Sequence, residues 1–174
     1  MGTMINRISV VVVANLIAML PQLCEAQVVP FQARGENAQY SSLTGTYAGG
    51  GQGTHVGRHA NQGRVRLPTI PTGNPLQFLW TTAEPHVITA ADGSTISLTG
   101  GGLVQLIPLD DGLFSAVWKA NFVVQGGTGR FANVGPGNGP IVIEAINNPF
   151  SLDDPIWTFS WTINGTIDLG RRGR

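Results

Sequence analysis

The strongest constraint on the fold is an alternation of apolar and polar residues with a period of two. Between Phe114 and Val124 every second residue is apolar, and nearly the same pattern returns between Trp157 and Ile167. Successive side chains of a strand point to opposite faces, so this pattern predicts two long strands with one buried face each. No window after residue 26 has an apolar period of 3.6 residues over a helical length. The sequence therefore predicts an all-β fold.

Shorter stretches with strand character precede and separate the two long ones. Turn signals such as Asn74-Pro75, Asp92-Gly93 and Asn138-Gly139 lie between them. The expected short strands are Val28–Arg34, Gly45–Gly49, Gly53–His59, Arg64–Pro68, Leu76–Thr82, His86–Ala90, Thr95–Thr99, Leu103–Ile107 and Ile141–Ile146. Such strands can close as a barrel or pack as a sandwich, and periodicity alone does not choose between these architectures.

The first 26 residues have the character of a secretory signal helix. Arg7 supplies a positive charge, Ile8 to Leu20 is an apolar stretch, and small residues precede a cleavage site after Ala26. The stretch is too short for a stable membrane span. We therefore expect a signal peptide over 1–26, a domain over 27–169, a basic tail over 170–174, and a secreted or periplasmic protein. A retained anchor and a lipoprotein modified at Cys24 are the alternatives.

Composition narrows the chemistry of the mature chain. The 174 residues include ten Lys and Arg against ten Asp and Glu, so the net charge is zero and gives no basic field for nucleic acid. Cys24, the single cysteine, and all three Met lie within the first 26 residues. After cleavage the chain would hold no disulfide, no thiolate nucleophile and no cysteine-ligated metal.

A glycine-rich run after the first long strand carries a family resemblance. The run Gly126-Gly127-Thr128-Gly129-Arg130-Phe131-Ala132 resembles a turn of the bacterial allene oxide cyclase barrel-like proteins, which are exported β-barrels of the calycin type. The segments Gly53 to Arg58 and Thr89 to Gly93 are similar to two further motifs of that family, as is the closing strand from Trp157. The resemblance implies a single antiparallel barrel of about eight strands.

The residues of this run have physical roles as a structural turn. Gly126, Gly127 and Gly129 can adopt positive φ and so reverse the chain. Phe131 is placed to plug one end of a barrel, and we expect Arg130 to pair with a carboxylate such as Glu144 or Asp168. A phosphate-binding loop would need a following helix, which Pro136 and Gly137 disfavour.

Aromatic residues on the apolar faces are the candidate ligand site. A solid core is one possibility, whereas an interior cavity above about 300 Å³ would favour ligand binding. In an open interior, Trp118 and Trp161 with Phe122 and Phe159 would form the walls, and His55 or Glu144 would be the polar anchor. The expected partner is a small apolar molecule, not nucleic acid.

No cofactor is expected, although His55 and His59 suggest one metal-binding alternative. They lie four residues apart and would share a strand face, where Glu84 or His86 could complete a zinc site. The resemblance does not imply such a site. Asp153 and Asp154 are adjacent, so as strand neighbours they would point to opposite faces and are expected to form a polar loop instead of a catalytic pair.

Two classes of function follow. The first is a non-enzymatic exported barrel that binds a small apolar ligand or serves as a scaffold. The second is a cofactor-free isomerase or cyclase acting on a fatty-acid-like substrate, for which a strongly raised pKa of an inward Glu144 would be the sign. Plant allene oxide cyclases, to which the family is related, have a cysteine that the mature chain lacks, and none of their catalytic residues is carried over. Their trimeric assembly is the oligomeric state that the resemblance implies.

Overall fold

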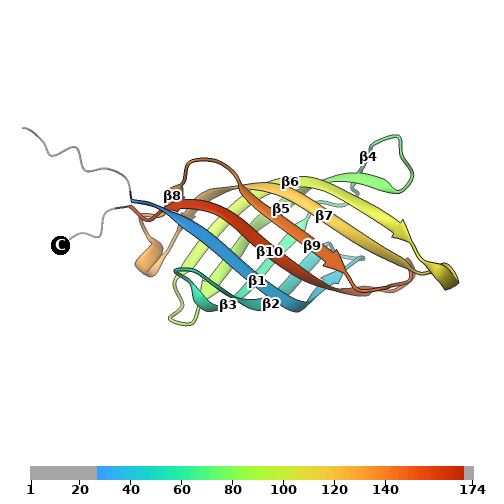
Figure 1. Cartoon of the computed structure of the whole chain (residues 1–174), viewed down its shortest axis with the longest axis horizontal. Coiled ribbons are helices and arrows are strands. Elements are labelled where there is room, and N and C mark those ends of the chain that lie inside the picture. Colours follow the sequence, from blue (N-terminus) through green and yellow to red (C-terminus); the bar gives the residue numbers. More distant parts are fainter. Residues whose placement is uncertain (1–26, 171–174) are drawn as a thin grey trace, which may run out of the picture.

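The computed structural model describes residues 27–170 and contains strands and two short 3-10 helices (Figure 1). The signal helix and most of the basic tail expected from the sequence lie outside the described residues. The elements are β1 (Val28–Ser41), β2 (Thr46–Gly53), β3 (Gly57–Val65), β4 (Ile70–Pro71), β5 (Gln77–Ala90), β6 (Thr95–Pro108), η2 (Asp110–Gly112), β7 (Phe114–Gly127), η3 (Gly129–Phe131), β8 (Gly135–Pro136), β9 (Ile141–Asn147) and β10 (Ile156–Asp168).

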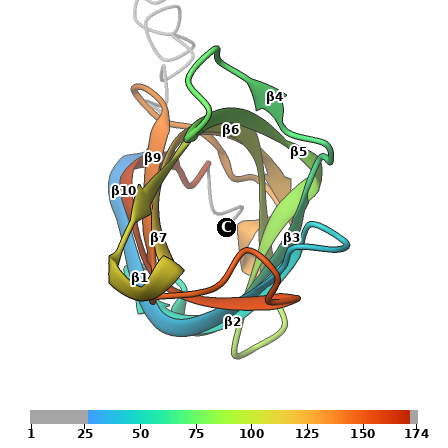
Figure 2. The ribbon, with the colours of Figure 1, turned by 90° about the vertical axis from the view of Figure 1, so that its right-hand side faces the viewer.

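Eight of these strands form a closed antiparallel barrel. Their order around the barrel is β1-β2-β3-β5-β6-β7-β9-β10, and pairing of β10 with β1 from Val28↔Asp168 to Ser41↔Ile156 closes it (Figure 2). The two-residue strands β4 and β8 pair with β5 and β10. The expectation of an all-β barrel of about eight strands is confirmed, and closure removes every long unpaired edge.

Several strands are longer than the sequence patterns predicted. The stretches Leu76–Thr82 and His86–Ala90 belong to the single strand β5, whose register shifts between Thr81 and His86. Thr95–Thr99 and Leu103–Ile107 likewise join into β6. A bulge restores the inward direction of side chains after an irregular stretch, so an interrupted alternation can belong to one continuous strand. The prediction of a strand over Gly53–His59 was wrong, because residues 54–56 form the turn between β2 and β3.

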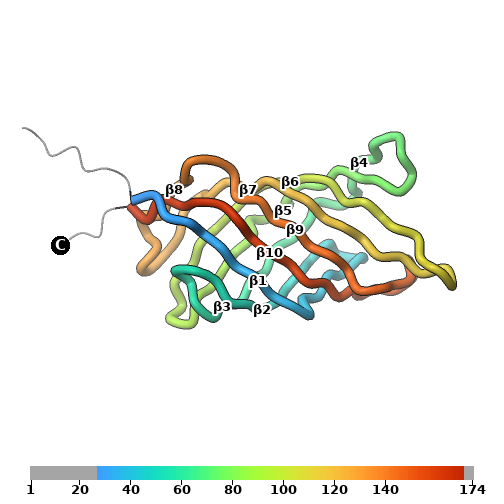
Figure 3. Tube along the Cα trace, viewed as in Figure 1, coloured from blue at the N-terminus to red at the C-terminus, as the bar shows by residue number. Residues whose placement is uncertain are grey.

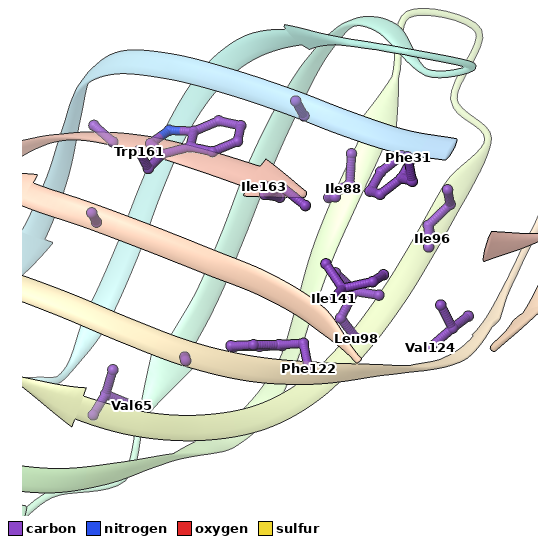
Figure 4. Packing of buried hydrophobic residues seen from close by; sticks show 14 of the residues in the cluster. Phe31, Val65, Ile88, Ile96, Leu98, Phe122, Val124, Ile141, Trp161 and Ile163 are labelled. Atoms are coloured by element: carbon purple, nitrogen blue, oxygen red, sulfur yellow. The ribbon is translucent and has the colours of Figure 1, made fainter. Parts of the chain in front are cut away.

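The two ends of the barrel are filled differently. At the end where β1 begins and β10 finishes, on the left of Figure 3, aliphatic side chains and the phenylalanines Phe31 and Phe131 fill the interior. Figure 4 shows these buried residues, among them Phe31, Ile88, Ile96, Leu98 and Ile141. We call this the filled end. The opposite end, with the loops at residues 42–45, 66–76, 109–113 and 148–155, has mainly aromatic residues inside, and we call it the aromatic end.

The glycine-rich turn closes the filled end. Phe131 is 3% exposed and plugs it as expected. Gly126 and Gly129 have φ of 141° and 59°, whereas Gly127 is needed because a Cβ there would collide with the backbone oxygens of Thr95 and Phe131. The expected partners of Arg130, Glu144 or Asp168, were wrong: its guanidinium contacts Asp92 at 3.0 Å.

Arg130 also joins three loops at this end. Besides the ion pair with Asp92 in the β5–β6 turn, its Nη2 donates to the carbonyl oxygen of His55 in the β2–β3 turn at 3.1 Å. The backbone N–H of Ser94 and the nearby Arg130 lower the pKa of the Asp92 carboxyl. Three of the four segments on which the resemblance was based therefore meet around one side chain.

Candidate functional site

The aromatic half of the barrel contains a cavity of about 70 Å³. It lies between the middle of the barrel and the aromatic end, and its walls come from seven of the eight barrel strands. The lining residues are Tyr40, Tyr47, Asn61, Val65, Trp80, His86, Trp118, Phe122, Ile143, Ala145, Asn147, Phe159, Trp161 and Ile163. Pockets for drug-sized ligands measure roughly 300–1,000 Å³, and an interior above about 300 Å³ was the sign of ligand binding expected from the sequence. The cavity is well below that volume, so it suits only a more compact molecule.

The wall is a continuous set of ring contacts. Trp80 packs edge-on against Trp118, with ring centroids 5.6 Å apart, and lies 6.0 Å from Phe122. Tyr40 contacts Trp118 at 5.5 Å and Trp157 at 5.3 Å. Tilted and edge-on aromatic pairs at such distances contribute beyond the apolar area that they bury, so the rings support one another around the cavity.

Glycines of β2 make room for the largest of these side chains. Gly49, Gly51 and Gly53 face the interior, and a Cβ on Gly51 would lie 2.9 Å from the Trp161 ring. On β1, a Cβ on Gly35 would lie 2.6 Å from Nε1 of the same indole. The indole of Trp161 therefore lies flat against a wall without side chains.

His86 is the principal polar group of the cavity wall. It is 5% exposed, stacks on Tyr47 with ring centroids 5.5 Å apart, and has its Nδ1 3.0 Å from the Tyr47 hydroxyl. Burial, and to a lesser extent the nearby His59, lower the pKa of His86 to about 4. Burial raises the pKa of both Tyr40 and Tyr47. These three lining side chains are thus neutral at pH 7.

Four buried side-chain nitrogens in the described part of the chain have no hydrogen-bond partner. They are Nε1 of Trp80, Nε1 of Trp161, Nε2 of His86 and Nε2 of His59. By contrast, Nε1 of Trp118 donates to Oδ1 of Asn147 at 2.6 Å. Native proteins pair nearly all buried polar groups with protein or water, so this concentration of unpaired nitrogens marks the barrel interior as unusual.

The predicted aromatic wall residues come together, but the predicted polar anchors lie elsewhere. Trp118, Trp161, Phe122 and Phe159 all line the cavity. His55 lies in the β2–β3 turn at the filled end with φ of 63°, and its Nε2 donates to the carbonyl oxygen of Pro30 at 3.1 Å.

Glu144 lies on the outer surface of β9. It pairs with Lys119 at 3.1 Å, its side chain is 48% exposed, and it borders an open outer hollow of about 730 Å³ across β1, β2, β9 and β10. A carboxylate in this position cannot act on a molecule inside the barrel.

The polar lining residue that sequence reasoning missed is His86. The alternation in the stretch His86–Ala90 already placed His86, Ile88 and Ala90 on one face, which is the signal that could have identified it. Tyr40 was missed because the first strand was expected to end at Arg34. A bulge between Gly35 and Ala38 instead carries that strand on to Ser41.

His55 and His59 have different surroundings. His59 is 6% exposed, its Nδ1 donates to the carbonyl oxygen of Gly57 at 3.0 Å, and its ring lies edge-on to Trp161. His55 is exposed in its turn. Among residues 27–170, no group of three or more His, Cys, Asp and Glu side chains is arranged to hold a metal ion.

The aromatic end carries most of the exposed large apolar residues. Of the twelve such residues in the described part of the chain, only Val123 and Val142 lie elsewhere. The ten at the aromatic end are Leu43, Leu67, Ile70, Leu79, Ile107, Leu109, Leu113, Ile146, Leu152 and Ile156. A gathering of exposed apolar side chains marks a region that meets apolar molecules or surfaces.

Comparisons with known proteins give no match. Neither the protein-family models, nor the curated proteins, nor the solved structures contain one that resembles this chain significantly. Within residues 27–170 there is also no helix with the length and apolar character that a membrane crossing requires.

Proposed function

We propose that this protein is a non-enzymatic barrel that binds a compact, mainly apolar molecule in its aromatic cavity. The observation that carries the proposal is the cavity itself, which has seven aromatic residues in its wall and no Lys, Arg, Asp or Glu. Apolar cavities of proteins stay dry and take up small apolar molecules. An engineered apolar cavity of about 150 Å³ binds benzene, so a cavity of about 70 Å³ limits the ligand to a molecule of at most about that size.

The residues around the cavity support binding more than catalysis. A cyclase or isomerase needs an acid or base beside the substrate with a pKa near the working pH. The titratable lining residues are Tyr40, Tyr47 and His86, and burial moves each pKa away from neutrality. The cavity volume also favours a compact ligand over a fatty-acid-like substrate.

Titration with benzene, followed by tryptophan fluorescence, tests the proposal. Ala145 lines the cavity, so Ala145→Leu would fill it, whereas the matched variant Ala60→Leu adds the same side chain on the outer face of β3. We expect saturable binding by the parent protein and by Ala60→Leu, and its loss in Ala145→Leu. Absence of saturable binding by the parent, or undiminished binding by Ala145→Leu, would refute the proposal.

We further propose membership of the bacterial allene oxide cyclase barrel-like family, export from the cytoplasm and assembly as a trimer. The closed eight-strand barrel and the convergence of three motif segments on Arg130 support the family.

The amino-terminal pattern supports export. Native mass spectrometry of the protein purified from its producing cell tests the last two: we expect a chain beginning at Gln27 and a mass of three chains. An uncleaved chain would contradict export, and a monomer would contradict the trimer.

A further inference from the structure

We propose that the ligand of the aromatic cavity carries a neutral hydrogen-bond acceptor, such as a carbonyl oxygen, which the indole N–H of Trp80 and the Nε2–H of His86 recognise. This inference rests on the proposed binding function and adds the chemical class of the ligand. It is carried by two side chains of β5 that line the cavity, are more than nine-tenths buried, and have no partner for these nitrogens among the described residues.

The indole nitrogen of Trp80 is a donor and cannot accept a hydrogen bond. Trp80 is 7% exposed, and its indole ring is held between Trp118 and Phe122. A buried donor without a partner destabilises the folded protein, so a ligand that brings an acceptor atom to it is favoured over one that does not. Rings that hold Trp80 in this way also fix the region in which the acceptor must lie.

His86 is a donor at Nε2 as well. Among the described residues, the only hydrogen-bond partner of the Tyr47 hydroxyl is Nδ1 of His86, at 3.0 Å. If the hydroxyl donates to Nδ1, the imidazole proton is on Nε2 and only one group is left unpaired. The opposite assignment would leave both the hydroxyl proton and Nε2 unpaired, so we assign the first tautomer. Trp80 and His86 both lie 6.0 Å from the ring of Phe122, which places them on the same side of the cavity.

The lack of charged side chains in the cavity wall restricts the ligand to a neutral hydrogen-bond acceptor. No Lys or Arg lines the cavity, and His86 is uncharged at pH 7. A carboxylate or phosphate there would be buried without a counter-charge, which costs far more than these hydrogen bonds return. A cation is disfavoured for a different reason, since it would leave both donors unpaired. Ketones, aldehydes, esters and ethers remain as the chemical class.

A pair of isosteric probes separates the acceptor from the apolar body. The ketone 3-methyl-2-butanone and the alkene 2,3-dimethyl-1-butene have the same shape, and only the ketone oxygen can accept a hydrogen bond. We expect the parent protein to bind both, with the ketone about tenfold tighter, as one to two hydrogen bonds to buried donors would produce. Calorimetric titration measures both affinities.

Trp80→Phe keeps an aromatic wall but removes one of the two donors, so the ketone-to-alkene preference should fall well below that of the parent protein. Trp157→Phe is the matched control, because Trp157 lies outside the cavity wall and its N–H already donates to Asp154, so its loss should leave the preference unchanged. In nitrogen-proton correlation spectra, the ketone should shift the indole signal of Trp80 downfield. The signals of Trp118 and of Trp157, which donates to the carbonyl oxygen of Asp154 at 2.9 Å, should stay in place.

The outcomes distinguish the two proposals. If the alkene binds as tightly as the ketone, the acceptor is not recognised and this inference is overturned while the binding function stands. The same conclusion follows if Trp80→Phe retains the preference of the parent protein. If neither probe binds at the highest concentration at which it is soluble, the proposed function itself fails. A preference that depends on Trp80 and not on Trp157 supports both.

Discussion

Burial of His86 makes the stability of the barrel dependent on pH. The imidazole is 5% exposed and its pKa is lowered to about 4, whereas an unfolded chain carries histidine with a pKa of about 6.5. Between these values the unfolded state binds a proton that the folded state does not, so lowering the pH favours unfolding. The stability associated with neutral His86 is therefore complete above about pH 6.5 and is lost as the pH falls toward 4.

The magnitude follows from the two pKa values. A pKa difference of about 2.5 corresponds to a limit of about 3 kcal/mol, and about 2 kcal/mol of this is lost between pH 7 and pH 5. Most carboxylates with ordinary pKa values remain ionised at pH 5, so this window isolates histidine. Urea unfolding at the two pH values, followed by near-ultraviolet circular dichroism, gives the difference in the free energy of unfolding.

Two variants assign the effect. His86→Gln removes the titrating group and should reduce the loss between pH 7 and pH 5 by about 2 kcal/mol, although the variant will be less stable at pH 7. His55→Gln is the control, because His55 is exposed at the filled end, and it should keep the pH dependence of the parent protein. An unchanged loss in His86→Gln would refute the reasoning from burial.

Three further predictions concern the filled end and the outer surface. Phe131→Ala should lower the free energy of unfolding by about 3–5 kcal/mol in urea titrations, because it empties a site that is 3% exposed, and a loss below about 1 kcal/mol would contradict its role as a plug. Arg130→Met should accelerate amide hydrogen exchange in residues 54–56 and 92–94 by releasing His55 and Asp92, whereas unchanged exchange there would show that Arg130 does not hold these loops. Glu144→Gln should change stability by no more than about 0.5 kcal/mol and leave benzene binding unaltered, since this carboxylate faces away from the cavity; weakened binding would contradict that placement.

The all-β class was predictable from the sequence because local patterns express it, whereas the choice of a barrel came from the resemblance and not from periodicity. The alternation from Phe114 and from Trp157 defines strands whose single apolar faces must be covered, and the glycine-rich run at 126–129 supplies the reversal between strands. The continuity of β1 and β5 was not predictable in this way. One extra residue in β1 and two in β5 interrupt the alternation, and an interrupted alternation resembles the end of a strand.

The cavity was predictable only in part, for a different reason. The alternation assigned Trp118, Phe122, Phe159 and Trp161 to the interior, and all four are in the wall, whereas Tyr40 was missed. The identity of the polar residues in the cavity wall depends on where along the barrel each strand passes the cavity. His55 failed as an anchor because it falls in a turn, four residues before a histidine that does point inward.

The loops joined by Arg130 and the two donors of the cavity lie toward opposite ends of the barrel, although the closing strand β10, which also carries the resemblance, contributes Phe159 and Trp161 to the cavity wall. Arg130, His55 and Asp92 hold the loops of the filled end, whereas Trp80 and His86 lie toward the aromatic end. Within the described part of the chain, these two groups of residues make no hydrogen bond or ring contact with each other. Substitution of Trp80 or His86 could therefore change the ligand without disturbing the turn that closes the barrel. A resemblance based on that turn predicts the scaffold, and the ligand must be inferred from the cavity wall.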